Sequence, residues 1–62
     1  MHPLEHEIQA VKDAFSEGQL TLEERNYLLQ EIKDVKAAQE CADDEETFRY
    51  IVQACNLAMS LT

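Results

Sequence analysis

Only one glycine and one proline interrupt the 62 residues of this chain, and their scarcity limits the folds that it can adopt. Hairpins, tight turns and flexible linkers depend on these two residue types. The apolar residues recur at steps of three and four, which is the spacing of one face of a helix. These features predict an all-α protein: a small two- to three-helix bundle, in which a helical hairpin is followed by a C-terminal helix.

A first helix is predicted over about residues 3–17. Pro3 suits the first helical position, where the backbone N–H has no partner, and Gly18 suits the left-handed residue that closes a helix. The apolar stripe of this helix consists of Leu4, Ile8, Val11 and Phe15.

A second helix is predicted over about residues 22–41, and Thr21 marks its start. Thr21 and Glu24 fit a capping box, in which the threonine hydroxyl accepts from a backbone N–H and the glutamate reaches back to the Thr21 amide. The inward positions of this helix are predicted at Leu22, Leu28, Ile32 and Val35, with Leu29 beside them.

The stripe of the second helix does not continue beyond about residue 42. Its next inward positions would be occupied by Glu45, Glu46 and Arg49. A new stripe starts at Phe48 and predicts a third helix over about residues 44–60, for which Asp43 and Glu46 can form a second capping box. One bent helix over residues 22–60 is the alternative, because neither glycine nor proline enforces the break.

The three stripes predict one helical domain over residues 1–62. Its predicted core consists of Phe15, Leu28, Ile32, Val35, Phe48, Ile51, Val52 and Cys55. Cys41 and Cys55 both lie in apolar patterns, which predicts buried thiols in a reducing compartment rather than a disulfide framework. A chain this short buries only about 60% of its unfolded surface. Good helix packing or a neighbouring subunit is therefore expected to add stability.

The charge of the chain limits its partners. Five lysines and arginines stand against 13 acids, for a net charge of −8. Such a surface repels phosphate backbones and anionic lipids, so no direct binding to nucleic acid or membrane is expected. No stretch approaches the roughly 18 apolar residues of a membrane span, and no signal-peptide pattern is present. The predicted localisation is cytoplasmic, meaning the host cytoplasm or the virion if a phage encodes the chain.

The sequence predicts neither an enzyme nor a bound cofactor or metal. No histidine lies near a serine or cysteine in the sequence, and no glycine-rich loop could hold an oxyanion or a phosphate. His2 and His6 have the spacing of two zinc ligands but lack a third. Residues 13–24 overlay a calcium loop, yet Phe15 stands where an oxygen ligand is needed. A bundle of this size is also expected to lack a pocket of about 300 Å³.

Two sets of residues are candidates for binding a partner protein. The first combines tyrosines at the stripe margins with small and adaptable residues of the third helix, which suit helix contacts. These residues are Tyr27, Tyr50, Ala54, Ala58, Met59 and Leu61. The second set is an acidic docking surface of Glu40, Asp43, Asp44, Glu45 and Glu46. Acids at the start of a helix also favour its dipole, which is the simpler explanation of this cluster.

Three segments of the chain resemble short acidic helical proteins encoded by bacteriophages. They are EGQLTLEER at residues 17–25, LLQEI at 28–32 and ADDE at 42–45. The resemblance implies a virion assembly component or a small factor that binds a host or phage protein, and it brings no catalytic residue.

The expected function is a non-catalytic protein–protein interaction or assembly module. It would act as a homo-oligomer or on a larger protein partner. The alternative is an acidic inhibitor that mimics nucleic acid and blocks a basic host or phage protein.

Overall fold

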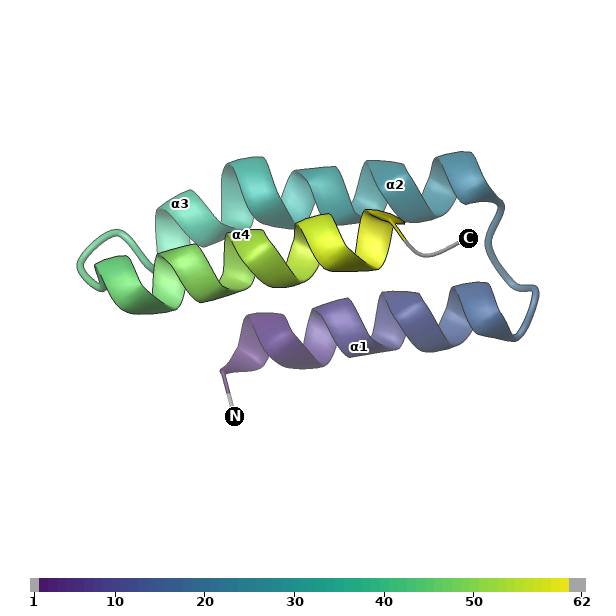
Figure 1. Cartoon of the computed structure of the whole chain (residues 1–62), viewed down its shortest axis with the longest axis horizontal. Helices are drawn as coiled ribbons and strands as arrows, with labels where there is room; N and C mark the ends of the chain where they lie inside the picture. Colours follow the sequence, from purple (N-terminus) through teal and green to yellow (C-terminus); the bar gives the residue numbers. More distant parts are fainter. Residues whose placement is uncertain (1, 61–62) are drawn as a thin grey trace.

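The described part of the chain forms three helical rods, which confirms the predicted all-α bundle. A computed structural model of the chain describes residues 2–60. Its elements are α1 (Pro3–Ser16), α2 (Leu22–Glu31), a π-helical turn η1 (Ile32–Lys36), α3 (Ala37–Glu40) and α4 (Glu45–Ser60). The segments α2, η1 and α3 follow one another without a break and form the long middle rod. This rod runs antiparallel to both α1 and α4, so α1 and α4 point in the same direction and pack side by side (Figure 1).

The ends of α1 form as the sequence predicts. Pro3 occupies the first turn, where the missing N–H costs no hydrogen bond. Gly18 has φ 79°, the left-handed conformation that glycine adopts without strain. The N–H of Gly18 donates to the carbonyl of Phe15 over 3.1 Å. The N–H of Gln19 donates to the carbonyl of Ala14 over 2.9 Å, which completes a Schellman motif.

The predicted capping box at the start of α2 is confirmed. The N–H of Glu24 donates to the hydroxyl of Thr21 over 3.1 Å, and the N–H of Thr21 donates to the carboxylate of Glu24 over 2.8 Å. Both bonds satisfy N–H groups that the first helical turn leaves without a partner.

Thr21→Ala removes one of these bonds and is expected to lower the free energy of unfolding by about 1 kcal/mol. In a domain of this size that loss corresponds to a fall in melting temperature of roughly 4–8 °C. Thr21→Ser, which keeps the hydroxyl, is the control and should melt close to wild type in the same calorimetric scan. Equal melting of the alanine variant and wild type would mean that the cap does not stabilise this turn.

A break separates α3 from α4, so the alternative of one bent helix is wrong. The helix resumes at Glu45, and its cap is Asp44 instead of the predicted Asp43. The N–H and the hydroxyl of Thr47 donate to the two carboxylate oxygens of Asp44 over 3.1 and 2.7 Å. These bonds from Thr47 hold the pKa of Asp44 below its ordinary value. The cap is therefore intact at neutral pH and is lost as the pH falls through the lowered pKa.

The π-helical turn explains why the predicted inward position Val35 is wrong. The N–H of Ala37 donates to the carbonyl of Ile32, five residues earlier, so this turn contains one extra residue. A regular helix would bring Val35 back to the face of Ile32. The extra residue instead makes Ala37 the next buried position, and Val35 is left 46% exposed.

The observed core overlaps the predicted one only in part. Its buried apolar residues are Leu4, Ile8, Leu29, Ile32, Ala37, Cys41, Ile51, Cys55 and Ala58. Phe15, Leu28, Phe48 and Val52, predicted in the core, are only half-buried. The predicted inward position Leu22 is wrong, since its side chain is 50% exposed. The middle rod is rotated slightly from its predicted orientation, and Leu29 replaces Leu28 as its central core residue.

Candidate protein-binding site

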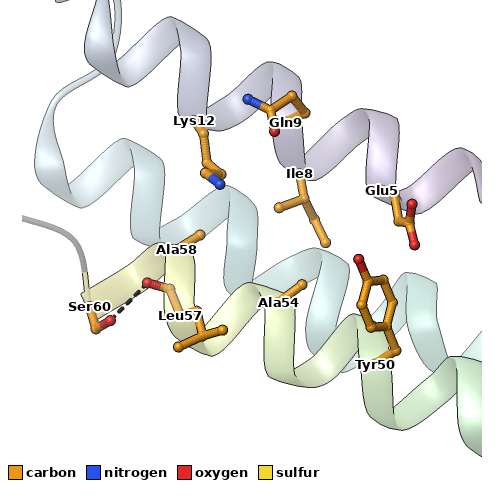
Figure 2. A pocket seen from close by; sticks show the side chains of 9 residues that line it. All are labelled: Glu5, Ile8, Gln9, Lys12, Tyr50, Ala54, Leu57, Ala58 and Ser60. Carbon is orange, nitrogen blue, oxygen red and sulfur yellow. Dashed lines mark hydrogen bonds between the residues drawn. The ribbon is translucent and has the colours of Figure 1, made fainter. Parts of the chain in front are cut away.

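A groove between α1 and α4 gathers several of the predicted binding residues. Its volume is about 370 Å³. The lining residues are Glu5, Ile8, Gln9 and Lys12 from α1, and Tyr50, Ala54, Leu57, Ala58 and Ser60 from α4 (Figure 2). The small side chains of Ala54 and Ala58 leave the hollow, while Tyr50 and Leu57 rise beside it, 53% and 61% exposed. The expectation that so small a bundle lacks a hollow of about 300 Å³ is therefore wrong, although this hollow is an open groove.

The two ends of the groove carry opposite charges. Glu5 lies beside Tyr50 at one end, and Lys12 lies toward Ala58 and Ser60 at the other (Figure 2). The side chains of Glu5 and Lys12 make no hydrogen bond or ion pair with any residue between positions 2 and 60. Both charges are therefore available to a partner.

The other lysines have partners within the protomer, which sets Lys12 apart. Lys36 pairs with Glu7 over 3.1 Å. The Lys33 ammonium donates to the side-chain carbonyl of Asn56 over 3.0 Å. Lys12 is the one lysine in the described residues whose charge has no such partner.

The remaining residues of the first predicted set lie elsewhere. Tyr27 is 69% exposed and lines a separate hollow with Leu20 and Leu28. Met59 is half-buried and packs against the core, so its side chain is not part of the groove. Leu61 lies outside the described residues. The structure thus joins Tyr50, Ala54 and Ala58 in one surface and separates Tyr27 and Met59 from it.

Leu57 belongs to this surface, although the sequence analysis did not select it. The apolar stripe predicted for the third helix consists of Phe48, Ile51, Val52, Cys55, Ala58, Met59 and Leu61. Tyr50, Ala54 and Leu57 form a second row at steps of four and three, which is also a helical spacing. That second row was the signal that could have revealed Leu57.

The predicted acidic docking surface lies at the turn between α3 and α4. All five of its members, Glu40, Asp43, Asp44, Glu45 and Glu46, are exposed. Two of them already make contacts within the protein: Asp44 caps α4, and Glu45 pairs with Arg49 over 2.8 Å. Further exposed acids lie near the opposite turn, at Glu17, Glu23 and Glu24. The acids are therefore spread over both ends of the bundle.

The two thiols are buried, as predicted, and are poor nucleophiles. Burial raises the pKa of Cys55 to about 11. Burial, followed by the charges of Glu40 and Asp44, also raises the pKa of Cys41. Its sulfur lies 3.7 Å from Nε2 of His2, whose Nδ1 accepts from the backbone N–H of Leu4 over 3.1 Å. With raised pKa values the thiolate form is scarce at neutral pH, so neither cysteine is an activated nucleophile.

Residues 2–60 lack two further kinds of feature. In this part of the chain, no group of three or more His, Cys, Asp or Glu side chains could hold a metal ion. Across the same residues, no helix is both long and apolar enough to cross a bilayer.

A buried arginine links the middle rod to the end of α4, and the sequence analysis did not foresee it. Arg25 is only 2% exposed. Its guanidinium stacks over the ring of Phe15, 4.5 Å from the centroid, and donates to the carbonyl of Met59 over 2.7 Å. It also donates to Oδ1 of Asn26 over 2.9 Å. Because the Met59 carbonyl lies at the negative end of the α4 dipole, the positive charge is stabilised there.

The chain matches no protein-family model, no curated protein and no solved structure. The groove has apolar walls at Ile8, Ala54 and Leu57, and opposite charges at its ends.

Proposed function

We propose that this protein is a non-catalytic protein-binding module that docks its partner in the α1–α4 groove. The observation that carries the proposal is the row formed by Tyr50, Ala54 and Leu57. Single exposed apolar residues are ordinary, but here two large ones flank a hollow with a small residue between them. This arrangement accepts an apolar side chain from a facing helix, as in ridges-into-grooves packing.

The low stability of so small a domain favours a protein-binding role. The free energy of unfolding scales with chain length and amounts to roughly 3–9 kcal/mol at this size. A partner that binds only the folded state increases the apparent stability. Covering Tyr50 and Leu57 would also bury apolar surface that the isolated bundle leaves in water.

An acidic inhibitor that mimics nucleic acid receives less support. A mimic needs a continuous row of free negative charges, because a duplex carries one charge per roughly 1.7 Å of its length. Acids lie at both turns and also along the helices, as at Glu5, Glu31 and Asp34, so they form no continuous row. Two members of the main cluster are engaged in a cap and an ion pair. Assembly of a phage particle stays a prediction from sequence resemblance, and the groove would serve that role equally well.

Photo-crosslinking tests the proposed binding surface. A benzophenone amino acid replaces Leu57 in the full chain, and cells that produce the chain naturally are irradiated. We expect crosslinks from this position to a protein, whether a second copy or another chain. The matched control carries the same group at Val35, which is also exposed but lies on η1. Absence of protein crosslinks at Leu57, or equal crosslinking at both positions, would contradict the proposal.

A further inference from the structure

Building on the protein-binding role, we infer that the occupant of the groove is a second copy of this chain. The two copies are related by a twofold axis that passes close to Ala54. In this dimer, Glu5 of each protomer faces Lys12 of the other. The inference rests on the spacing and the charge of the groove residues.

The spacing of the groove residues is nearly symmetric about its centre. Glu5 and Lys12 are seven residues apart on α1, and Tyr50 and Leu57 are seven apart on α4. Seven residues are about two helical turns, or roughly 10.5 Å. Since α1 and α4 run in the same direction, Glu5 and Tyr50 share one end of the groove, whereas Lys12 and Leu57 share the other (Figure 2). Ala54 lies between the two ends.

A twofold axis that lies in the interface plane, perpendicular to α1 and α4, makes this surface complementary to itself. In such an interface residue i contacts residue j, and j contacts i, so each end meets the opposite end of the other copy. The carboxylate of Glu5 then meets the ammonium of Lys12, and the ring of Tyr50 meets the side chain of Leu57. Ala54 meets its own equivalent, and its small side chain allows two α4 helices to approach closely. A twofold axis parallel to the helices would instead place α1 of each copy over α4 of the other, so Glu5 would meet Tyr50 and Lys12 would meet Leu57, and neither charge would gain an ion pair.

Electrostatics favour this orientation despite the net charge of −8. Glu5 and Lys12 have no partner of their own among the described residues, so pairing them breaks no existing contact. Repulsion between the two copies is screened beyond about 8 Å at physiological ionic strength. A basic helix of another protein is the competing occupant, but it would set a cation against Lys12.

A stable interface would cover a large share of the surface of so small a chain. A stable interface covers about 800 Å² on each partner. The chain exposes 4300 Å², so this area is about a fifth of its surface. The contact must therefore include the face formed by α1 and α4 beyond the hollow itself.

Charge exchange in the full-length chain tests the arrangement by sedimentation equilibrium. Glu5→Lys and Lys12→Glu each place like charges at both ends of the interface, and each is expected to weaken dimerisation about tenfold. The double variant, Glu5→Lys with Lys12→Glu, restores both ion pairs and should dimerise like wild type. Its net charge equals that of wild type, so the comparison isolates the contacts from the overall charge.

Two controls distinguish specific pairing from other effects. Asp43→Lys changes the charge by the same amount as Glu5→Lys but lies in an exposed turn, so it should not weaken the dimer. Circular dichroism checks that every variant keeps the helical content of wild type. If overall charge alone mattered, Glu5→Lys would strengthen the dimer, because it makes the chain less negative.

The outcomes separate this inference from the proposed function. A wild-type chain that stays monomeric up to millimolar concentration overturns the twofold dimer. If Leu57 then crosslinks to a different protein, the protein-binding role survives without the dimer. A dimer that both single variants leave unchanged, or that the double variant fails to restore, also overturns the inference. A monomer without protein crosslinks would refute both proposals.

Discussion

Leu29→Ala is expected to lower the free energy of unfolding by roughly 3–4 kcal/mol, within the usual range for a buried leucine. Leu29 has no exposed surface and lies at the centre of the core. Its removal leaves a cavity between three helices that cannot easily close, because each helix also packs on the other two. Since the whole domain has only about 3–9 kcal/mol of stability, much of the variant should be unfolded at 37 °C.

Leu22→Ala is the matched control for this prediction. It makes the same chemical change in the same helix, but its side chain is 50% exposed. The loss in the free energy of unfolding should stay below about 1 kcal/mol, because half of this side chain is already exposed to water in the folded state. Urea denaturation followed by circular dichroism measures both variants. Similar losses for the two leucines would mean that the middle rod is rotated back toward the orientation predicted from the sequence.

Arg25→Ala is expected to cost roughly 3 kcal/mol, a second large loss. The side chain supplies a charged hydrogen bond to the carbonyl of Met59 and stacks over Phe15, and each contact is typically worth about 1–3 kcal/mol when buried. Without it, the end of α4 loses its tie to α2, and the carbonyl of Met59 loses this donor. Hydrogen exchange should report the loss first in the last turn of α4.

Two further variants separate the role of Arg25 from that of charge in general. Arg49→Ala removes an exposed arginine from an ion pair with Glu45 and should cost at most about 0.5 kcal/mol. Arg25→Lys keeps the charge but loses the planar fork and the stacking, so it should fall between wild type and Arg25→Ala. If Arg25→Lys were as stable as wild type, the positive charge alone would account for the stabilisation.

Arg25 also affects the groove, through the position of α4. Leu57 and Ala58 lie just before the carbonyl that Arg25 holds. A frayed last turn of α4 would remove this end of the groove together with its contacts. We therefore regard Arg25 as a positioning residue for the proposed binding surface, although it does not line that surface.

The sequence by itself determined the helices and most of their ends. Pro3, Gly18 and the pair Thr21 and Glu24 act on backbone groups within a few residues of themselves, so their effects are present in the sequence before any helix packs. The break before α4 was also predictable, since charged residues occupy the positions where an uninterrupted helix would turn inward. Only the capping residue was misplaced, by one position, from Asp43 to Asp44.

Tertiary structure alone decided which side of each helix is buried and where the groove lies. Arg25 is buried because its partners, Phe15 and Met59, come from two other helices, and no local pattern identifies a buried arginine. The π-helical turn exposes Val35, since an extra residue lets both Ile32 and Ala37 reach the core. The groove needs the small residues of α4 to lie beside α1, an arrangement that depends on how the three helices pack. Interactions along one helix act within about four residues, whereas packing between helices brings together residues far apart in the chain. The groove depends on packing between helices, so the sequence pattern alone does not reveal it.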